Sequence, residues 1–281
     1  MSAAPHTPLA VDAQWLAALR HAADQPTARP RAALLHAGAV IGSVAVDLFS
    51  RIAIPRHPDG RPVLVLITPD GVWQVEGELT SGLALLAQAL QAAGLAGAWR
   101  DEQLAVCDVS GRRLGTVERA AVRPLGIATQ AVHLVGFGPS GGLDSGMWVQ
   151  QRAMSKATEP GMWDTLMGGM VPAADSLQEA LARETWEEAG LHLAQLQGLR
   201  LGGGVDLRRP SDDGRNAAGY MLEHIDWFTC TVPAGLQPVN QDGEVSQFLL
   251  LSQAELLQKL QRDEFTLEAA CVLVAALGLD L

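Results

Sequence analysis

The chain has 281 residues, of which 48% are apolar and 18% are charged; this is enough apolar material for two domains and excludes a disordered chain. The formal net charge is −11, so electrostatic repulsion disfavours nucleic acid as a partner. No stretch approaches the roughly 20 uninterrupted apolar residues of a membrane-spanning helix, so a membrane protein is not expected.

Helices and short strands alternate over the first part of the chain. Apolar spacing and turn residues predict helices over residues 12–23 and 79–93, and strands over 63–67, 71–75, 104–107 and 113–117. The pattern changes around Pro124 and Gly126, where we place a domain boundary. We therefore expect a smaller α+β domain over residues 1–124 and a second domain over residues 125–281.

The second part of the chain carries longer elements. Strands are predicted over residues 131–137 and 147–152, joined by a glycine-rich turn, and around 225–232. A loop over 153–163 and the pair Gly168 and Gly169 precede a long helix, and helices are also predicted over 252–262 and 267–277. We find no internal repeat and no low-complexity tract.

The cysteines and the start of the chain indicate a cytoplasmic protein. Cys107, Cys230 and Cys271 are too far apart for a metal-binding pair, and their number is odd, so we expect reduced, buried thiols. The N-terminus has no basic flank before a continuous apolar run, and a signal peptide is therefore not expected.

The long helix has strong signals at both ends. Asp175 and Ser176 suit the N-cap position, and Ser176 with Glu179 fits a capping box. Gly190 is placed to end the helix. These signals predict a helix that begins next to Ser176 and ends at Gly190.

Three carboxylates fall on one face of this helix. They are Glu184, Glu187 and Glu188, at i, i+3 and i+4. They repel one another near the negative end of the helix dipole, and a cation among them would remove that repulsion. Carboxylate oxygens are the ligands that Mg²⁺ prefers, so a magnesium site competes here with a simple solvated acidic face. The opposite face, which can pack into a core, holds Ala182, Thr185, Trp186 and Ala189.

The same segment closely resembles the Nudix box, the signature of the Nudix hydrolases. The family pattern is Gly, five residues, Glu, seven residues, Arg-Glu, an aliphatic residue, any residue, Glu-Glu, any residue, Gly and an aliphatic residue. The positions in register are Gly169, Arg183, Glu184, Glu187, Glu188, Gly190 and Leu191. Two positions depart: Asp175 replaces a Glu and is one methylene shorter, and Thr185 replaces an aliphatic residue.

The resemblance implies an α/β fold, a Nudix α/β/α sandwich with a mixed sheet, and cleavage of a diphosphate bond. The implied ligands of Mg²⁺, or of Mn²⁺ as an alternative, are Glu184, Glu187 and Glu188. Arg183 would hold a carboxylate in place through a charge-assisted hydrogen bond. The implied catalytic residues are Glu184, Glu187, Arg183 and Glu244, with either a box glutamate or Glu244, in a distant loop, as the general base.

Two cations stand shortly before the glycine pair. Arg152 and Lys156 can meet the charge of a phosphate. Together with Gly168 and Gly169 they form the expected substrate-binding set. The competing interpretation of Arg152 and Lys156 is that they are ordinary surface residues.

The resemblance extends to a Nudix subgroup that carries an N-terminal domain of unassigned function and is often labelled thiamine-pyrophosphokinase-related. The similar segments are residues 99–102, 118–121, 126–127, 131–137, 151–156, 160–164 and 240–245. Some members hydrolyse the diphosphates of thiamine and its oxidised analogues to monophosphates. The resemblance therefore implies such a small-molecule diphosphate as the substrate.

Other functions compete with this one. The box does not separate thiamine diphosphates from nucleoside diphosphate derivatives such as ADP-ribose or a dinucleotide. A non-catalytic ligand sensor of this fold commonly loses box glutamates, which this chain keeps. The isomerase branch, which acts on isopentenyl diphosphate, uses a cysteine in a loop before the box, where this chain has none. The N-terminal domain is a candidate for dimerisation, as a homodimer, or for substrate gating.

Overall fold

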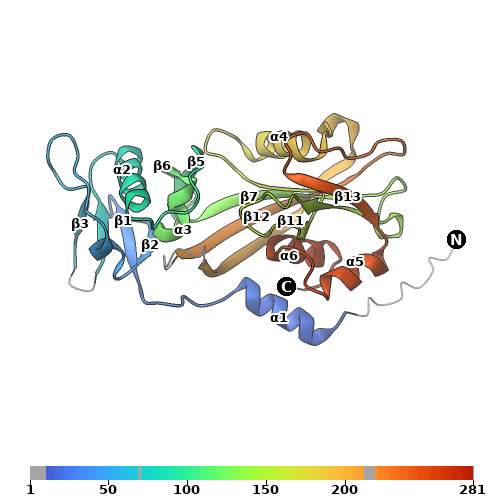
Figure 1. Cartoon of the computed structure of the whole chain (residues 1–281), viewed down its shortest axis with the longest axis horizontal. Helices are drawn as coiled ribbons and strands as arrows, with labels where there is room; N and C mark the ends of the chain where they lie inside the picture. Colours follow the sequence, from blue (N-terminus) through green and yellow to red (C-terminus); the bar gives the residue numbers. More distant parts are fainter. Residues whose placement is uncertain (1–10, 69–70, 212–218, 281) are drawn as a thin grey trace.

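The computed structural model describes residues 11–68, 71–211 and 219–280. Residues 1–10, where no signal peptide is expected, lie outside these ranges. The elements gather in two regions, one around a four-stranded sheet and one around a seven-stranded sheet (Figure 1). Within the described ranges, no helix has the length and apolar character needed to cross a bilayer.

The first region is a small sheet with one long helix. Its strands are β1 (Arg31–His36), β2 (Ala39–Ala45), β3 (Leu64–Leu66) and β4 (Trp73–Val75), in the order β2-β1-β4-β3. Helix α2 (Leu79–Ala92) follows, then the hairpin of β5 (Gln103–Cys107) and β6 (Arg113–Glu118), and then α3 (Val122–Leu125). The predicted strands and the helix over 79–93 are confirmed, whereas the sequence did not indicate β1.

Helix α2 supplies much of the apolar core of this region. Leu79, Leu83, Leu86 and Leu90 recur at spacings of three and four residues and are buried. That spacing places them on one stripe of the helix. Each buried leucine contributes about 1.5–3 kcal/mol of transfer free energy, so this stripe fixes the helix against the sheet.

The second region is built on a mixed sheet in the order β11-β12-β7-β8-β13. Its strands are β7 (Thr129–Phe137), β8 (Met147–Arg152), β11 (Gln197–Ser211), β12 (Gly219–Thr231) and β13 (Val245–Leu251). Strands β12 and β7 run parallel, and the other neighbours run antiparallel. Two short strands enter between β7 and β8: β9 (Trp163–Asp164) pairs with β8, and β10 (Met167–Met170) pairs with β7.

Helices cover both faces of this sheet, which confirms the α/β/α sandwich. On one face α4 (Leu177–Ala189) packs over β7 and β10, with Val132 and Leu134 in the shared core. On the other face lie α5 (Gln253–Leu260) and α6 (Leu267–Ala276), with Ala131 and Val135 in their core. Alternate residues of β7 thus face opposite cores, as a strand requires.

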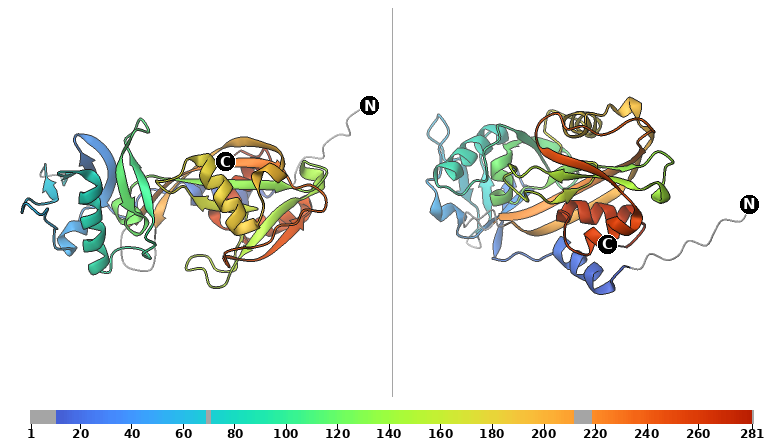
Figure 2. Two further views of the ribbon diagram at one scale, coloured as in Figure 1. Left: turned by 90° about the horizontal axis from the view of Figure 1, so that it is seen from above. Right: turned by 45° about the vertical axis from the view of Figure 1, so that its right-hand side comes forward.

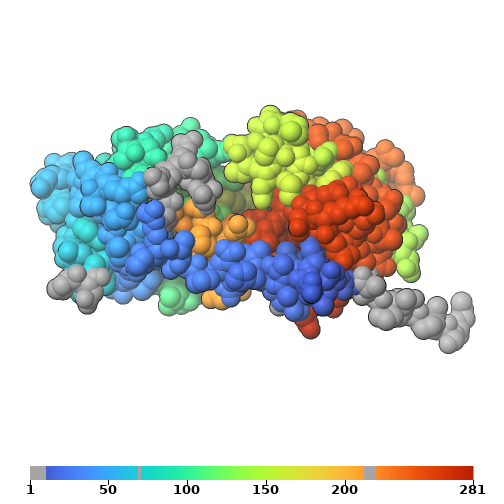
Figure 3. All heavy atoms as spheres, turned by 60° about the horizontal axis from the view of Figure 1, so that its bottom comes forward, coloured from blue at the N-terminus to red at the C-terminus, as the bar shows by residue number. Residues whose placement is uncertain are grey.

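Helix α1 (Ala13–Ala23) packs with the second region, although it comes first in the chain. It contacts α6 and β11, and Leu19 and Ala23 belong to the core beneath α6. Figure 3 shows this blue segment lying along the red C-terminal helices. The division of the chain near residue 124 remains a prediction, and it would separate α1 from the helix and strand on which it packs.

The three cysteines are free. Cys230 and Cys271 are buried, and burial raises the pKa of each thiol to about 12. Cys107 is exposed, so the expectation that all three are buried is wrong for this residue. It lies at the end of β5, where alternate residues of the hairpin face solvent.

Candidate functional site

Helix α4 begins and ends where the sequence predicts. The Glu179 N–H donates to Ser176 Oγ (3.3 Å), and the Ser176 N–H donates to Glu179 Oε2 (2.7 Å), which completes the capping box. Gly190 ends the helix with φ of 63°, in the left-handed region that favours glycine. The position of the carboxylates along α4 is therefore set by local sequence.

The buried stripe of α4 is rotated from the one that the sequence suggests. Thr185 and Glu188 are buried, whereas Ala182 and Trp186 are exposed. The expectation that Ala182 and Trp186 pack into a core is wrong, because each helical step turns by about 100° and carries Trp186 away from the stripe of Thr185. Thr185 fits the core because its hydroxyl donates to the Leu181 carbonyl (2.6 Å).

Glu188 is the most deeply buried carboxylate of the box. Its side chain accepts hydrogen bonds from Gln150 Nε2 (2.7 Å) and from the Gly168 N–H (3.1 Å). Burial raises the pKa of Glu188 to about 8, with the nearby charges of Glu184 and Asp164 acting in the same direction. A carboxylate placed in this environment is stabilised by a cation.

Arg183 connects three carboxylates. Its Nε donates to Asp175 Oδ2 (3.0 Å), and its Nη1 donates to Glu184 Oε1 (3.0 Å) and to Glu187 Oε2 (2.9 Å). Asp175 therefore reaches the arginine in spite of its shorter side chain. These charge-assisted bonds orient Glu184 and Glu187, and they tie the start of the box to the middle of α4.

Gly169 leaves the space that the Glu184 carboxyl group occupies. A Cβ at residue 169 would lie 2.5 Å from Glu184 Cδ and 2.7 Å from its Oε1. Burial raises the pKa of Glu184 to about 7, against the lowering effect of Arg183. On the other face of β10, a Cβ at Gly168 would lie 2.6 Å from His133 Cε1. Both glycines are therefore required for close packing, and Gly168 and Gly169 lie among the carboxylates of α4.

A loop from a distant part of the sequence is attached to the end of α4. The Val239 N–H donates to the Ala189 carbonyl (2.8 Å), and the Gln241 N–H donates to the Glu187 carbonyl (3.0 Å). A Cβ at Gly190 would lie 2.5 Å from the Val239 carbonyl oxygen, so glycine is required there as well. These bonds bring residues 239–244 beside the box.

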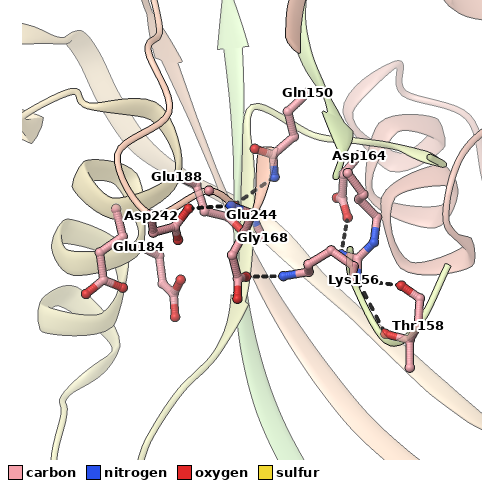
Figure 4. Close-up of polar contacts among 12 residues, drawn as sticks. Gln150, Lys156, Thr158, Asp164, Gly168, Glu184, Glu188, Asp242 and Glu244 are labelled. Atoms are coloured by element: carbon pink, nitrogen blue, oxygen red, sulfur yellow. Dashed lines mark hydrogen bonds and ion pairs between the residues drawn. The ribbon is translucent and has the colours of Figure 1, made fainter. Parts of the chain in front are cut away.

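This loop places two further carboxylates at the site. In Figure 4, Asp242 and Glu244 lie beside Glu184 and Glu188, and Lys156 faces them. Lys156 forms an ion pair and hydrogen bond with Glu244 Oε2. Burial acts to raise the pKa of Glu244, but the contact with Lys156 and the charges of nearby arginines outweigh it and hold that pKa below its usual range.

Arg152 is bonded within the loop that follows β8, and its charge also acts on Glu244. Its guanidinium donates to the carbonyls of Thr158 (3.0 Å) and Glu159 (3.2 Å) and lies 3.6 Å from Asp164 Oδ2. Its side chain is 14% exposed. The structure thus brings Lys156 and Glu244 together with the box, while Arg152 organises the loop of residues 153–162.

Sequence reasoning missed two residues that the structure places at this site. Gln150 donates to Glu188 from β8, one position before the segment 151–156 of the subgroup resemblance. Asp242 stands beside the candidate base Glu244, and its Oδ1 accepts the Glu244 N–H (2.8 Å). Asp242 lies in the segment 240–245 of the subgroup resemblance, so the sequence could have indicated it. No sequence pattern indicates Gln150, because its role depends on the pairing of β8 with distant strands.

The donor set fits a hard divalent cation. Glu184, Glu187 and Glu188 supply carboxylate oxygens, and the pKa values of Glu184 and Glu188 are raised by burial and by mutual repulsion, which a cation would relieve. Across the part of the chain that is described, no three His, Cys, Asp or Glu side chains converge as metal ligands. In this arrangement Arg183 holds Glu184 and Glu187, so cation binding requires these two carboxylates to turn from it.

Comparison with known proteins gives one family match and several relatives. The model of the NUDIX domain matches residues 129–271. Nudix hydrolase 20, chloroplastic, of Arabidopsis thaliana is 30% identical over 159 residues, which cover 57% of this chain and 41% of that protein. An uncharacterized Nudix hydrolase of Pseudomonas aeruginosa is 38% identical over 100 residues, which cover 36% of this chain and 53% of that protein. The chain thus spans about half the length of these two relatives.

A third relative is an isopentenyl-diphosphate Delta-isomerase of Streptomyces coelicolor. It is 30% identical over 174 residues, which cover 62% of this chain and 82% of that protein. The family match begins at the first residue of β7 and ends within α6, so it covers the sheet, α4 and the loop of residues 239–244.

Proposed function

This chain belongs to the NUDIX family, and on that premise we propose that it hydrolyses a diphosphate bond in a small organic diphosphate with the help of a divalent cation. The observation that supports this most strongly is that the loop of residues 239–244, with Asp242 and Glu244, is bonded to the end of α4, which carries the box glutamates. In the reaction a water oxygen forms a bond to phosphorus as the P–O–P bond breaks. The products are a monophosphate and inorganic phosphate.

Glu184, Glu187 and Glu188 would hold the cation, Mg²⁺ or Mn²⁺. When bound, the cation would withdraw charge from the diphosphate oxygens and lower the pKa of the attacking water. Arg183 orients two of these carboxylates, and Gly169 leaves the room that Glu184 needs. Positioning and charge compensation by these groups supply most of the rate in this type of phosphoryl transfer.

Glu244 is the proposed general base. It would accept the proton of the attacking water at its carboxylate, which Lys156 keeps ionised. Lys156 has a second role when substrate binds, because its ammonium group can then meet a phosphate oxygen and leave Glu244 free to take the proton.

Replacing Lys156 with methionine is expected to shift the pH dependence of kcat/KM. The pKa of Glu244 lies below its usual range, and the active form is the ionised one, so activity is lost as the pH falls through that pKa. Without Lys156 that pKa rises, and the acid limb moves to higher pH. The measurement is kcat/KM from pH 4 to pH 9 for wild type and Lys156→Met.

The matched control is the double variant Lys156→Met, Glu244→Gln. Glu244→Gln alone should lower kcat by about 10²–10⁴-fold, and the shift of the acid limb should then be absent from the double variant. If the acid limb stays in place in Lys156→Met, another group is the base. The same holds if Lys156→Met moves the acid limb equally with Glu244 present and with Glu244→Gln.

The proposed substrates are thiamine diphosphate and its oxidised analogues, because of the subgroup resemblance over residues 99–102, 151–156, 160–164 and 240–245. The alternative substrate class is a nucleoside diphosphate derivative such as ADP-ribose or a dinucleotide. The test is a panel with Mg²⁺ that contains thiamine diphosphate, its oxo and oxy analogues, ADP-ribose, a dinucleotide and a nucleoside triphosphate. Phosphate and monoester products are followed.

Each outcome of the panel selects one function. Turnover of the thiamine compounds supports the full proposal, and turnover confined to nucleotides keeps the reaction but replaces the substrate. Tight binding of one ligand without turnover of any would favour the non-catalytic sensor. A cytoplasmic location and a homodimer remain predictions that the panel does not address.

Isomerisation is the second candidate, because an isopentenyl-diphosphate isomerase is among the relatives. The segment between β8 and α4, residues 153–176, contains no cysteine. Burial raises the thiol pKa of Cys230 and Cys271 to about 12, so neither supplies a thiolate at neutral pH. Isopentenyl diphosphate added to the panel should therefore remain unisomerised. Formation of its allylic isomer would favour isomerisation over hydrolysis as the function of this chain.

A further inference from the structure

The N-terminal hairpin is fixed against the loop that leads into α4. Leu104 of β5 forms a bridge with Pro172, and the Ala173 N–H donates to the Gln103 carbonyl (2.7 Å). From β6, Arg113 Nη1 donates to the Ala173 carbonyl (2.6 Å). Figure 2 shows the hairpin between α2 and α4. These bonds hold the start of β5 against residues 172–173, in the segment between β10 and α4.

The turn that precedes β5 is held in a strained and specific shape. Asp101 has φ of 54°, a conformation that is unfavourable for a residue with a side chain, and its Oδ1 accepts from Trp99 Nε1 (2.8 Å). The Arg100 N–H donates to Glu118 Oε1 (3.0 Å). Glu118 is 2% exposed, and its Oε2 has no hydrogen-bond partner within the described structure. The burial of this carboxylate costs free energy and fixes the backbone of residue 100.

The segment that the hairpin contacts, at Pro172 and Ala173, lies between two residues of the candidate active site: Gly169, which packs against the Glu184 carboxyl group, and Asp175, which accepts from Arg183. The charge of Arg100 acts on Glu244, where it adds to the lowering effect of Lys156 against the raising effect of burial on the pKa. Glu102 is paired with Arg119 (2.7 Å). Residues 100–102 come directly before Gln103, whose carbonyl accepts the Ala173 N–H, so the turn lies next to the segment that links Gly169 to Asp175.

The site has few cations to receive a diphosphate. Arg183 is bound to three carboxylates, Lys156 is bound to Glu244, and Arg152 is bound within its own loop. The Arg100 side chain is exposed, and its guanidinium makes no hydrogen bond or ion pair with any residue in the described ranges. A planar guanidinium is suited to binding phosphate oxygens through two hydrogen bonds.

We propose that Arg100 is a substrate-binding residue that receives the phosphate oxygens, so that the N-terminal region completes the active site of the second region. This inference rests on the proposed function in one respect only, namely that the ligand is a diphosphate. The strained turn at Asp101 and the buried Glu118 hold Arg100 in its place at the border of the site. The hydrogen bond from Ala173 to Gln103 holds that turn against the segment that leads into α4.

The test compares Arg100→Gln with the matched control Arg112→Gln. Arg112 lies on the same hairpin but pairs with Asp108 at the far turn, and its side chain is 73% exposed. The probe is methylenediphosphonate, which cannot be hydrolysed, with Mg²⁺, and its Kd is measured by calorimetry. Arg100→Gln should weaken binding by about 10- to 100-fold, the effect of losing a charged hydrogen bond. The Kd of Arg100→Lys should lie between those of wild type and Arg100→Gln. The Kd of Arg112→Gln should equal that of wild type.

The two proposals fail in different ways. Equal Kd values for Arg100→Gln and Arg112→Gln, or no binding of the probe by wild type, would overturn the role of Arg100. Absence of diphosphate turnover in wild type, with binding that still depends on Arg100, would overturn the hydrolase function and leave this inference standing. Where turnover is found, Arg100→Gln should raise KM by a similar factor while kcat changes little.

Discussion

Replacing Glu187 with glutamine is expected to lower kcat for a diphosphate substrate by about a thousandfold, the loss typical of removing a group that stabilises charge in the transition state. The substitution removes one carboxylate from the proposed metal site and keeps the shape of the side chain. The Glu187 side chain is 41% exposed, and its partner in the structure is Arg183. The fold should therefore survive, and the measurement is kcat together with the melting temperature.

The matched control lies on the same helix. Glu179→Gln makes the same change of charge in the first turn of α4, away from the carboxylate cluster, and glutamine can keep the capping box. This control should retain wild-type turnover. Loss of activity to the same extent in both variants would assign the effect to the helix rather than to the site, and full activity of Glu187→Gln would remove Glu187 from the mechanism.

Replacing Gly169 with alanine is expected to lower kcat by about a hundredfold, the effect of displacing a catalytic group by roughly 1 Å. The added methyl group would lie 2.5 Å from Glu184 Cδ, a distance that no side chain tolerates. The carboxyl group must then move away from the position that Gly169 leaves open. The measurements are kcat of the variant and its affinity for Mn²⁺, which should both fall when the Glu184 carboxyl group is displaced.

A double-variant comparison identifies the cause of that loss. If Gly169→Ala acts through Glu184, its effect should be large in the wild-type background and small when Glu184 is already glutamine. Equal losses in the two backgrounds would mean that Gly169 acts by another route, such as a change in the backbone of β10.

Local sequence signals predicted α4 almost completely. The capping box of Ser176 and Glu179 and the left-handed Gly190 depend on residues within one turn of each helix end, so no distant contact was needed to place them. The same holds for the leucine stripe of α2. The rotation of the buried stripe toward Glu188 was not predictable, because it depends on Gln150 and Gly168 from other strands.

Strands whose partners are distant were harder to predict. Strand β11 extends from Gln197 to Ser211, but the glycines at residues 202–204 interrupt its apolar pattern, and its pairing with β12 determines its conformation. Strand β13 has exposed leucines at residues 249 and 250, which do not follow the alternation of a half-buried strand. Both lie at the edges of the sheet, where burial gives the weakest pattern.

The site itself was predictable in part. The box glutamates and Arg183 stand close together in sequence, whereas Lys156 and Glu244 are brought together only by the fold. The role of Arg152 in binding substrate remains a prediction, and its hydrogen bonds to Thr158 and Glu159 depend on the path of the loop. The approach of residues 100–102 to the site depends on the docking of β5 against Ala173, which no local pattern indicates.

Binding of Mn²⁺, followed by electron paramagnetic resonance with turnover measured in the same samples, tests whether the box glutamates hold a catalytic cation. Wild type and Glu179→Gln should bind Mn²⁺ saturably, Glu187→Gln should bind it at least about tenfold more weakly, and hydrolysis should rise with occupancy and stop when a chelator is added. Hydrolysis that persists in the chelator, or equal Mn²⁺ affinity in wild type and Glu187→Gln, would contradict that role of the box glutamates.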